Sequence, residues 1–274
     1  DDLERMAFTD QLTGLLNHAS AQRQIAARLA EKPKGKFALV IFDLDDTLYD
    51  YKALERAAFE CVGELVRERL GVSEEQCEGA FMRARQATKA KLGETATSHS
   101  RMLYFQKTLE YLDIRPLYLA LEMYETYWGF FLDNMMLYPG VRELLEALHE
   151  KYIRVGVCTD LLAHIQHRKL RRLGMMDDVD CLVTSEEAGV EKPAPGIFHL
   201  CLEKLRLPAE EVCFVGDNLE RDVKGAMAAG LQAVWFHPEG KGTSEEDKAQ
   251  EGFDVVSDYE ELHRLLAERI EGGL

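Results

Sequence analysis

Short apolar runs alternate with helical patterns over most of the chain. The first run, residues 37–42, is rich in β-branched and aromatic side chains, which is typical of a strand buried on both faces of a parallel sheet. Further strands are predicted at residues 153–158, 181–183, 212–215, 232–236 and 253–256. Helices are predicted between and after them, at residues 141–151, 159–173, 196–205, 219–229 and 258–270. The alternation predicts an α/β core with a parallel sheet and right-handed crossovers.

The region after the first strand, residues 51–134, carries helical patterns alone. Apolar residues recur at helical spacing from Leu54 to Leu70, and Ser73 is a typical N-cap for the helix that follows. Two more helices are predicted before residue 134, and their many aromatic residues are expected to form mostly core. We therefore expect a helical domain at residues 51–134, inserted in a core that comprises residues 36–50 and 135–274.

Residues 1–35 are predicted to form a helical appendage of two helices that ends in the breakers Lys32-Pro33-Lys34-Gly35. Asp10 to Asn17, DQLTGLLN, resembles the start of a diguanylate cyclase (GGDEF) domain, in which a helix and a strand ending in Asp-Leu-Asp follow. The resemblance stops there, because Thr47-Leu48 replace the family's Phe-Lys and no GGDEF-like tetrad occurs downstream. We expect no cyclase activity. The segment is interpreted as a fragment of that family, as helices that pack on the core or mediate dimers, or as a fusion artefact.

Composition narrows the possible partners. The 274 residues are 46% apolar and 30% charged, and a formal net charge of -16 argues against non-specific binding to nucleic acid or anionic membranes. A local cluster of lysine or arginine still suffices for an anionic substrate. The six cysteines form no C-x-x-C pair, and no apolar run reaches membrane-spanning length. With no signal peptide at the start, we expect a cytoplasmic protein with buried thiols.

Polar residues follow the predicted strands in four groups. These groups are Asp43-x-Asp45-x-Thr47, Thr159-Asp160, Lys192 before Pro193, and Asp217 with Asp222 after a glycine. Because ligands bind open α/β sheets at the carboxyl ends of the strands, we expect the groups to gather in one site. Alone, Thr159 would be an ordinary N-cap, Lys192 a surface lysine and Asp222 a first-turn helix charge. The presence of all four groups, in this order and each after a predicted strand, favours an active site.

The residues in this set fit phosphoryl transfer. Asp43 is the predicted nucleophile, because a carboxylate can attack phosphorus and form an aspartyl-phosphate. Asp45 is the predicted general acid and base, protonating the leaving alkoxide and then accepting a proton from water. Two neighbouring carboxylates favour a bound cation, and Mg²⁺ prefers oxygen ligands. Asp43 and Asp217 are the predicted metal ligands, with Asp45 reaching the metal through its backbone carbonyl.

The other members of the set are predicted to hold the phosphate or to complete the metal site. Thr159 is expected at a helix N-terminus, where backbone N–H groups favour an anion, and Lys192 supplies positive charge. Thr47 and Asp160 are grouped with them as phosphate-binding residues. Asp222 is a further candidate metal ligand or a neighbour of the ligands.

The motifs resemble those of the haloacid dehalogenase superfamily. DLDDTLY at residues 43–49, VCTD at 157–160, EKPAP at 191–195 and GDNLERD at 216–222 look like its four motifs, in the family's order, and the helical insert is similar to its C1 cap. The resemblance implies a Rossmann-like core, Mg²⁺ and a cap that closes over the substrate. Residues 216–230 particularly resemble the branch with N-acylneuraminate-9-phosphatase and the pyrimidine 5'-nucleotidases.

Within this superfamily the residues favour a phosphatase. Dehalogenase members lack an acid at the position of Asp45, because a halide leaves without a proton. A phosphomutase remains open, since it uses the same four groups and differs in what captures the aspartyl-phosphate. We expect a Mg²⁺-dependent phosphatase of a small soluble phosphomonoester, acting as a monomer or homodimer without nucleic-acid or membrane partners. The alternative from another class is a catalytically weak regulatory protein that dimerises through its N-terminal helices.

Overall fold

The computed structural model describes residues 37–115, 117–238 and 252–271. The core of this part is a six-stranded sheet, ordered β3-β2-β1-β4-β5-β6, in which every neighbouring pair is parallel. The strands are β1 Leu39–Phe42, β2 Arg154–Thr159, β3 Cys181–Thr184, β4 Val212–Gly216, β5 Gln232–Phe236 and β6 Asp254–Val256. The predicted parallel α/β sheet is confirmed.

Strand β1 lies at the centre of the sheet because it is apolar on both sides. Val40 is paired with Val155 of β2 and Cys213 of β4. Leu39 and Ile41 face one hydrophobic core, and Val40 and Phe42 face the other. All four side chains are buried, as expected for a strand covered on both faces.

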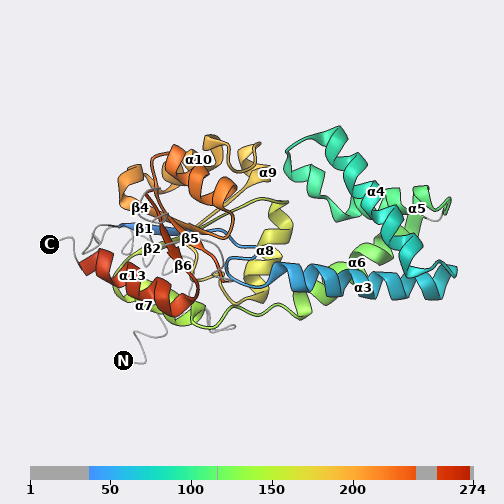
Figure 1. Ribbon diagram of the computed structural model, residues 1–274, viewed down its shortest axis with the longest axis horizontal. Helices are drawn as coiled ribbons and strands as arrows, with labels where there is room; N and C mark the ends of the chain where they lie inside the picture. The colour runs from blue at the N-terminus through green and yellow to red at the C-terminus, as the bar shows by residue number, and fades with distance from the viewer. Residues whose placement is uncertain (1–36, 116, 239–251, 272–274) are drawn as a thin grey trace, which may run out of the picture.

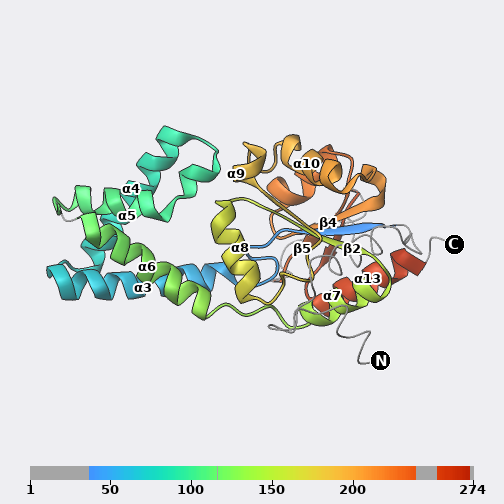
Figure 2. The ribbon, with the colours of Figure 1, turned by 180° about the vertical axis from the view of Figure 1, so that it is seen from behind.

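Helices cover both faces of the sheet, as Figures 1 and 2 show. Helices α7 (Val141–Glu150) and α13 (Tyr259–Glu271) lie on one face, with α8 (Ala163–Arg172) in the same hydrophobic core. Helix α10 (Pro195–Leu205) and α11 (Gly225–Ala228) pack on the other. The short elements are α9 (Ser185–Ala188), η2 (Ala209–Glu211) and η3 (Leu219–Lys224).

A helical insert lies between β1 and α7. It contains α3 (Tyr51–Leu70), α4 (Glu74–Leu92), η1 (Ala96–His99), α5 (Arg101–Tyr111) and α6 (Leu117–Asp133), and it stands at one end of the molecule (Figure 1). Ser73 caps α4 in a capping box with Gln76, and Gly71 ends α3 in the left-handed conformation. Aromatic side chains fill the interior of the insert; the buried ones include Phe81, Tyr104, Phe105, Tyr127, Trp128 and Phe131.

Two of the predicted helices differ in the structure. Helix α8 begins at Ala163 rather than at residue 159, because Leu161 has a φ of 121° and its N–H donates to Ser185 Oγ. The helix predicted at 219–229 is divided into a π-helical turn, η3, and the short α11, with Val223 N–H donating to the carbonyl of Asn218. Both departures lie beside the candidate site.

The predicted N-terminal helices and the cyclase-like segment lie outside the described residues. Over residues 37–115, 117–238 and 252–271, none of the helices combines the length and apolar character that a membrane crossing requires.

Candidate active site

The candidate residues gather where the strand order reverses, between β1 and β4. Asp43 follows β1 directly and Asp217 follows β4, so the two carboxylates meet at the carboxyl edge of the sheet. A pocket of about 230 Å³ opens there. Seven of the eight candidates line it: Asp43, Asp45, Thr159, Asp160, Lys192, Asp217 and Asp222; the other lining residues are Asp46, Lys52, Asn218 and Arg221.

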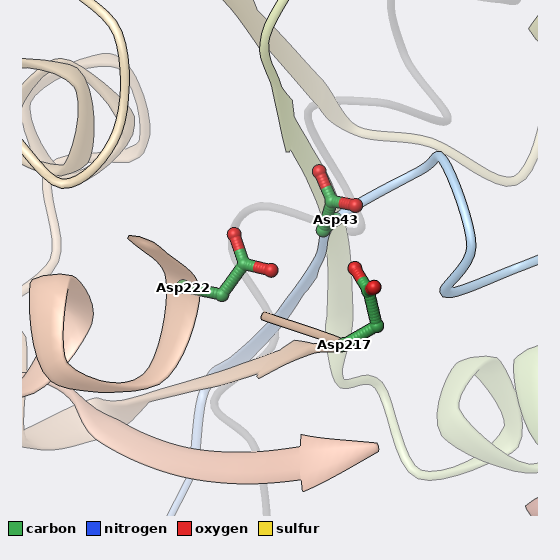
Figure 3. A group of neighbouring side chains, drawn as sticks. All are labelled: Asp43, Asp217 and Asp222. Carbon is green, nitrogen blue, oxygen red and sulfur yellow. The ribbon is translucent and has the colours of Figure 1, made fainter. Parts of the chain in front are cut away.

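Three carboxylates form an acidic cluster at the base of the pocket. One oxygen each from Asp43, Asp217 and Asp222 lies within 4.8 Å of the others, and Figure 3 shows the three side chains grouped together. Gly216 permits this approach, because a Cβ there would lie 2.5 Å from Asp222 Cβ. An all-oxygen donor set of this kind suits a hard cation such as Mg²⁺.

Burial makes the charges of this cluster costly. It raises the pKa of Asp43 well above its usual range, with Lys192 opposing the rise and Asp222 and Asp217 adding to it. Burial, with the charges of Asp222 and Asp46, raises the pKa of Asp217 to about 7. The cluster is therefore a place where a bound cation would relieve a concentrated negative charge.

Lys192 is a buried partner of two of these carboxylates. Its Nζ lies 2.5 Å from Asp43 Oδ1 and 2.6 Å from Asp222 Oδ1, and its side chain is 3% exposed. Burial alone would lower the pKa of Lys192, but attraction to Asp222 and Asp43 outweighs it and raises the pKa well above the usual value. Lys192 is therefore a buried member of the site and not a solvated surface lysine.

Asp160 and Arg221 hold the segment that carries Lys192. Asp160 Oδ1 accepts the Lys192 backbone N–H at 3.1 Å, and Arg221 Nη2 donates to Asp160 Oδ2 at 2.8 Å. Arg221 Nε also donates to the Lys192 carbonyl at 3.0 Å. Burial raises the pKa of Asp160, against the attraction of Lys192 and Arg221. Asp160, predicted as a phosphate-binding residue, lines the pocket while its carboxylate organises this segment.

Thr159 and Thr47 occupy different places. Thr159 ends β2 in the pocket wall, where its Oγ1 accepts a hydrogen bond from Gln166 Nε2 at 2.7 Å. It is not the N-cap of a helix, because α8 begins three residues after Asp160. Thr47 is fully buried; its hydroxyl donates to Asp43 Oδ2 at 3.4 Å and accepts the Asp217 N–H at 3.1 Å. Thr47 thus bridges the ends of β1 and β4, behind the pocket.

Asp45 has a partner that the sequence analysis missed. Lys169 Nζ of α8 lies 2.7 Å from both carboxylate oxygens of Asp45, and the hydroxyl of Tyr49 donates to Asp45 Oδ1 at 2.6 Å. Burial lowers the pKa of Lys169, and Asp45 opposes that effect. One signal of this partner was available in the sequence. Lys169 lies on the same face of α8 as Ile165 and Leu170, and this face is buried.

A second missed group joins the insert to the core. His99 Nε2, at the end of η1, lies 2.9 Å from Glu191 Oε1, and Arg221 Nη2 lies 3.0 Å from Glu191 Oε2. Burial opposes the change, but His99 and Arg221 together lower the pKa of Glu191. Because Glu191 precedes Lys192, this contact lies directly beside the pocket. The histidine pattern in the sequence gave no sign of it.

The fold is an open parallel α/β sheet with its candidate site at the topological switch point, where such sheets bind ligands. Comparison with known proteins then specifies the family: the model of the haloacid dehalogenase-like hydrolases matches residues 37–230, which include all eight candidate residues. The chain belongs to the haloacid dehalogenase-like hydrolases. The predicted family resemblance is confirmed for this region.

Individual relatives agree with this assignment. The chain is 41% identical over 218 residues to a ribulose-1,5-bisphosphate 5-phosphatase from Halopiger xanaduensis, covering 78% of this chain and 89% of the relative. It is 30% identical over 210 residues to the N-acylneuraminate-9-phosphatase of Mus musculus, covering 74% and 83%. The HAD-hydrolase YfnB from Bacillus subtilis, solved bound to magnesium, superposes with a TM-score of 0.65 at 22% identity, covering 85% of this chain and 99% of YfnB. The predicted enzyme class, a phosphoric monoester hydrolase, is confirmed.

Proposed function

We propose that this chain is a Mg²⁺-dependent phosphatase that hydrolyses a small phosphorylated metabolite through an aspartyl-phosphate on Asp43. One observation carries the proposal. The buried ammonium of Lys192 lies within 2.6 Å of both Asp43 and Asp222, and the same two carboxylates belong to the acidic cluster with Asp217. The proposed nucleophile, the proposed phosphate-binding cation and the proposed metal ligands thus lie in contact at one point of the pocket.

The acidic cluster fits the metal. Asp43, Asp217 and Asp222 would hold Mg²⁺ through carboxylate oxygens, with Asp45 contributing its backbone carbonyl. When bound, the ion would neutralise the repulsion between the substrate phosphate and the nucleophile. The oxygen-only donors and the raised pKa of Asp217 support this assignment, as does the magnesium reported for YfnB.

The reaction would proceed in two steps. In the first, a carboxylate oxygen of Asp43 bonds to phosphorus while the bond from phosphorus to the leaving oxygen breaks, and Asp45 gives its proton to that oxygen. In the second, Asp45 takes a proton from water as the water oxygen bonds to phosphorus and the bond to Asp43 breaks. The products are an alcohol and inorganic phosphate, and both aspartates return to their starting states.

The surrounding residues would place the phosphate. Lys192 and Thr159 line the pocket, and the Lys192 ammonium and the Thr159 hydroxyl would contact the phosphate oxygens. Asp160 would act through the Lys192 segment that it holds, and Thr47 through the two carboxylates that it bridges. These two assignments replace direct phosphate contact for Asp160 and Thr47.

We further propose that residues 51–134 form a cap over a catalytic core of residues 36–50 and 135–274. The insert is all-helical where the structure describes it, and its η1 reaches the core through the His99–Glu191 contact. Closure of such a cap would exclude water from the reacting phosphate. All six cysteines lie in the described part of the chain and none of them forms a disulfide, which favours a reducing compartment such as the cytoplasm.

The test is phosphate release from a panel of phosphomonoesters and sugar bisphosphates, with Mg²⁺ and with EDTA. Ribulose-1,5-bisphosphate and N-acylneuraminate 9-phosphate belong in the panel because of the relatives' activities. We expect Mg²⁺-dependent release with one substrate well ahead of the rest. Asp43→Asn should abolish turnover while the protein stays folded, and Asp177→Asn, at an exposed position, should not. Normal turnover by Asp43→Asn would refute the mechanism, and no release from any substrate would favour a phosphomutase or a regulatory protein.

A further inference from the structure

The carboxylate of Asp45 is held by two side chains that do not belong to the acidic cluster. Lys169 Nζ contacts both of its oxygens at 2.7 Å, and the Tyr49 hydroxyl contacts one of them at 2.6 Å. The side chain of Lys169 is fully buried, whereas that of Asp45 is 22% exposed and lines the pocket. Asp45 thus faces the substrate space while a buried cation fixes the plane of its carboxylate.

Lys169 is enclosed by four aromatic rings. Its Nζ lies 5.2 Å from the ring centre of Tyr51, 5.6 Å from Phe131, 5.7 Å from Trp128 and 5.9 Å from Tyr49. Such rings attract an ammonium group through their negative faces. A buried lysine is tolerated only when it is paired, and Asp45 together with this aromatic cage supplies that pairing.

Three of the four rings come from the insert. Tyr51 begins α3, directly after the segment that carries Asp45, and Trp128 and Phe131 lie on α6. Lys169 itself belongs to α8 of the core, and α6 and α8 are in contact. The place of the Lys169 ammonium therefore depends on the insert and the core together.

We propose that Lys169 is a positioning residue for Asp45, and that the aromatic rings of the insert set its place. This inference rests on the proposed function, in which Asp45 protonates the leaving oxygen. One Asp45 oxygen stays on Lys169 while the other reaches the leaving oxygen and later the attacking water. The insert would thereby influence the chemistry through the orientation of Asp45, in addition to covering the pocket.

The leaving group distinguishes this role from a merely structural ion pair. An alkoxide leaves phosphorus only with a proton, whereas p-nitrophenolate leaves readily without one. General acid catalysis contributes about 10²–10⁴-fold to rate, so a misplaced acid should slow alkyl phosphates far more than p-nitrophenyl phosphate. A fold defect would slow both substrates alike.

The experiment compares Lys169→Met, which keeps the apolar stem and removes the charge, with Lys169→Arg and with Arg171→Met on the exposed side of the same helix. With Lys169→Met we expect kcat/KM to fall about 100-fold for the best alkyl phosphate and less than about 10-fold for p-nitrophenyl phosphate. The loss should reside in kcat for the alkyl substrate. Lys169→Arg should recover part of it, and Arg171→Met should match the parent enzyme. Equal losses on both substrates, or a loss confined to KM, would overturn the proposal.

Crystal structures of the parent protein and Lys169→Met supply a readout without turnover. We expect the Asp45 carboxylate to rotate away from its position in the parent protein. If the parent protein releases no phosphate, the proposed phosphatase function fails, but a rotated Asp45 still supports the positioning role. An Asp45 carboxylate that is unmoved in Lys169→Met would overturn that role, whatever the activity.

Discussion

Replacing Asp217 by Asn should stabilise the metal-free protein at pH 8. The pKa of Asp217 is raised to about 7 by burial and by the charges of Asp222 and Asp46. A carboxyl group with a folded-state pKa above its unfolded value of about 3.9 favours folding when protonated. That contribution is fully present below about pH 4 and is lost as the pH rises through about 7, so at pH 8 the ionised Asp217 destabilises the native state.

The size of the effect follows from the shift in pKa. About three pKa units, at about 1.36 kcal/mol each, correspond to about 4 kcal/mol at pH 8. Because the pocket is open to solvent, part of this is screened, and we expect Asp217→Asn to raise the free energy of unfolding by about 2–4 kcal/mol in EDTA. At pH 5 most of Asp217 is protonated, and the gain should shrink to about 1 kcal/mol.

Urea unfolding at pH 5 and pH 8, with EDTA or with Mg²⁺, measures both consequences. A ligand present at 100 times its dissociation constant stabilises a protein by about 2.7 kcal/mol, so Mg²⁺ should stabilise the parent protein at pH 8 and stabilise Asp217→Asn much less. Asp177→Asn, at an exposed position, is the matched control and should change neither quantity. If Asp217→Asn is less stable than the parent protein at pH 8 in EDTA, the cluster is not under electrostatic strain and the reasoning is refuted.

Two further substitutions probe the geometry of the site. Gly216→Ala would place a methyl group 2.5 Å from Asp222 Cβ, so it should weaken Mg²⁺ binding at least tenfold in a calorimetric titration and lower the unfolding free energy by about 1–3 kcal/mol. Gly79→Ala is its control, because an added Cβ there meets nothing within 4 Å. Alanine at this helical position should stabilise α4 by up to about 1 kcal/mol. Equal Mg²⁺ affinity in the two variants would contradict the packing argument. His99→Ala removes the contact with Glu191 and should lower kcat/KM about fivefold, the equivalent of about 1 kcal/mol for one hydrogen bond. His263→Ala, at an exposed position on α13, is the control and should leave kcat/KM unchanged. If kcat/KM is also unchanged in His99→Ala, the contact between His99 and Glu191 does not contribute to activity.

The sheet and the strand-end residues could be predicted because their signals are local. The strand at β1 is an unbroken apolar run, and Asp43 is the first residue after it. Once the strands are parallel, topology alone brings Asp43 and Asp217 to the same edge. Asp222 could be predicted for the same reason, because Gly216, which leaves space for its side chain, belongs to the same motif.

The missed residues depend on packing between distant segments. Lys169 and Asp45 are separated by 124 positions, and the sequence around either residue does not indicate that the other is its partner. The late start of α8 arises from a contact between Leu161, which lies between β2 and α8, and Ser185, the first residue of α9. The contact between His99 and Glu191 requires the placement of the insert against the core. Helical periodicity predicts which face of α8 is buried, but not that a lysine on this face meets a carboxylate.

The charges at the base of the pocket give a reason for a divalent ion in particular. Asp43, Asp217 and Asp222, when ionised, carry three negative charges, and Lys192 offsets one of them through its contacts with Asp43 and Asp222. The two remaining negative charges equal the charge of one Mg²⁺ ion. A monovalent cation would leave these four side chains with a net negative charge that repels a phosphate, whereas a divalent ion would bring their summed charge to zero. The contact between Lys192 and Asp43 would then exchange in part for contacts with the phosphate, and this exchange would free the Asp43 oxygen for attack.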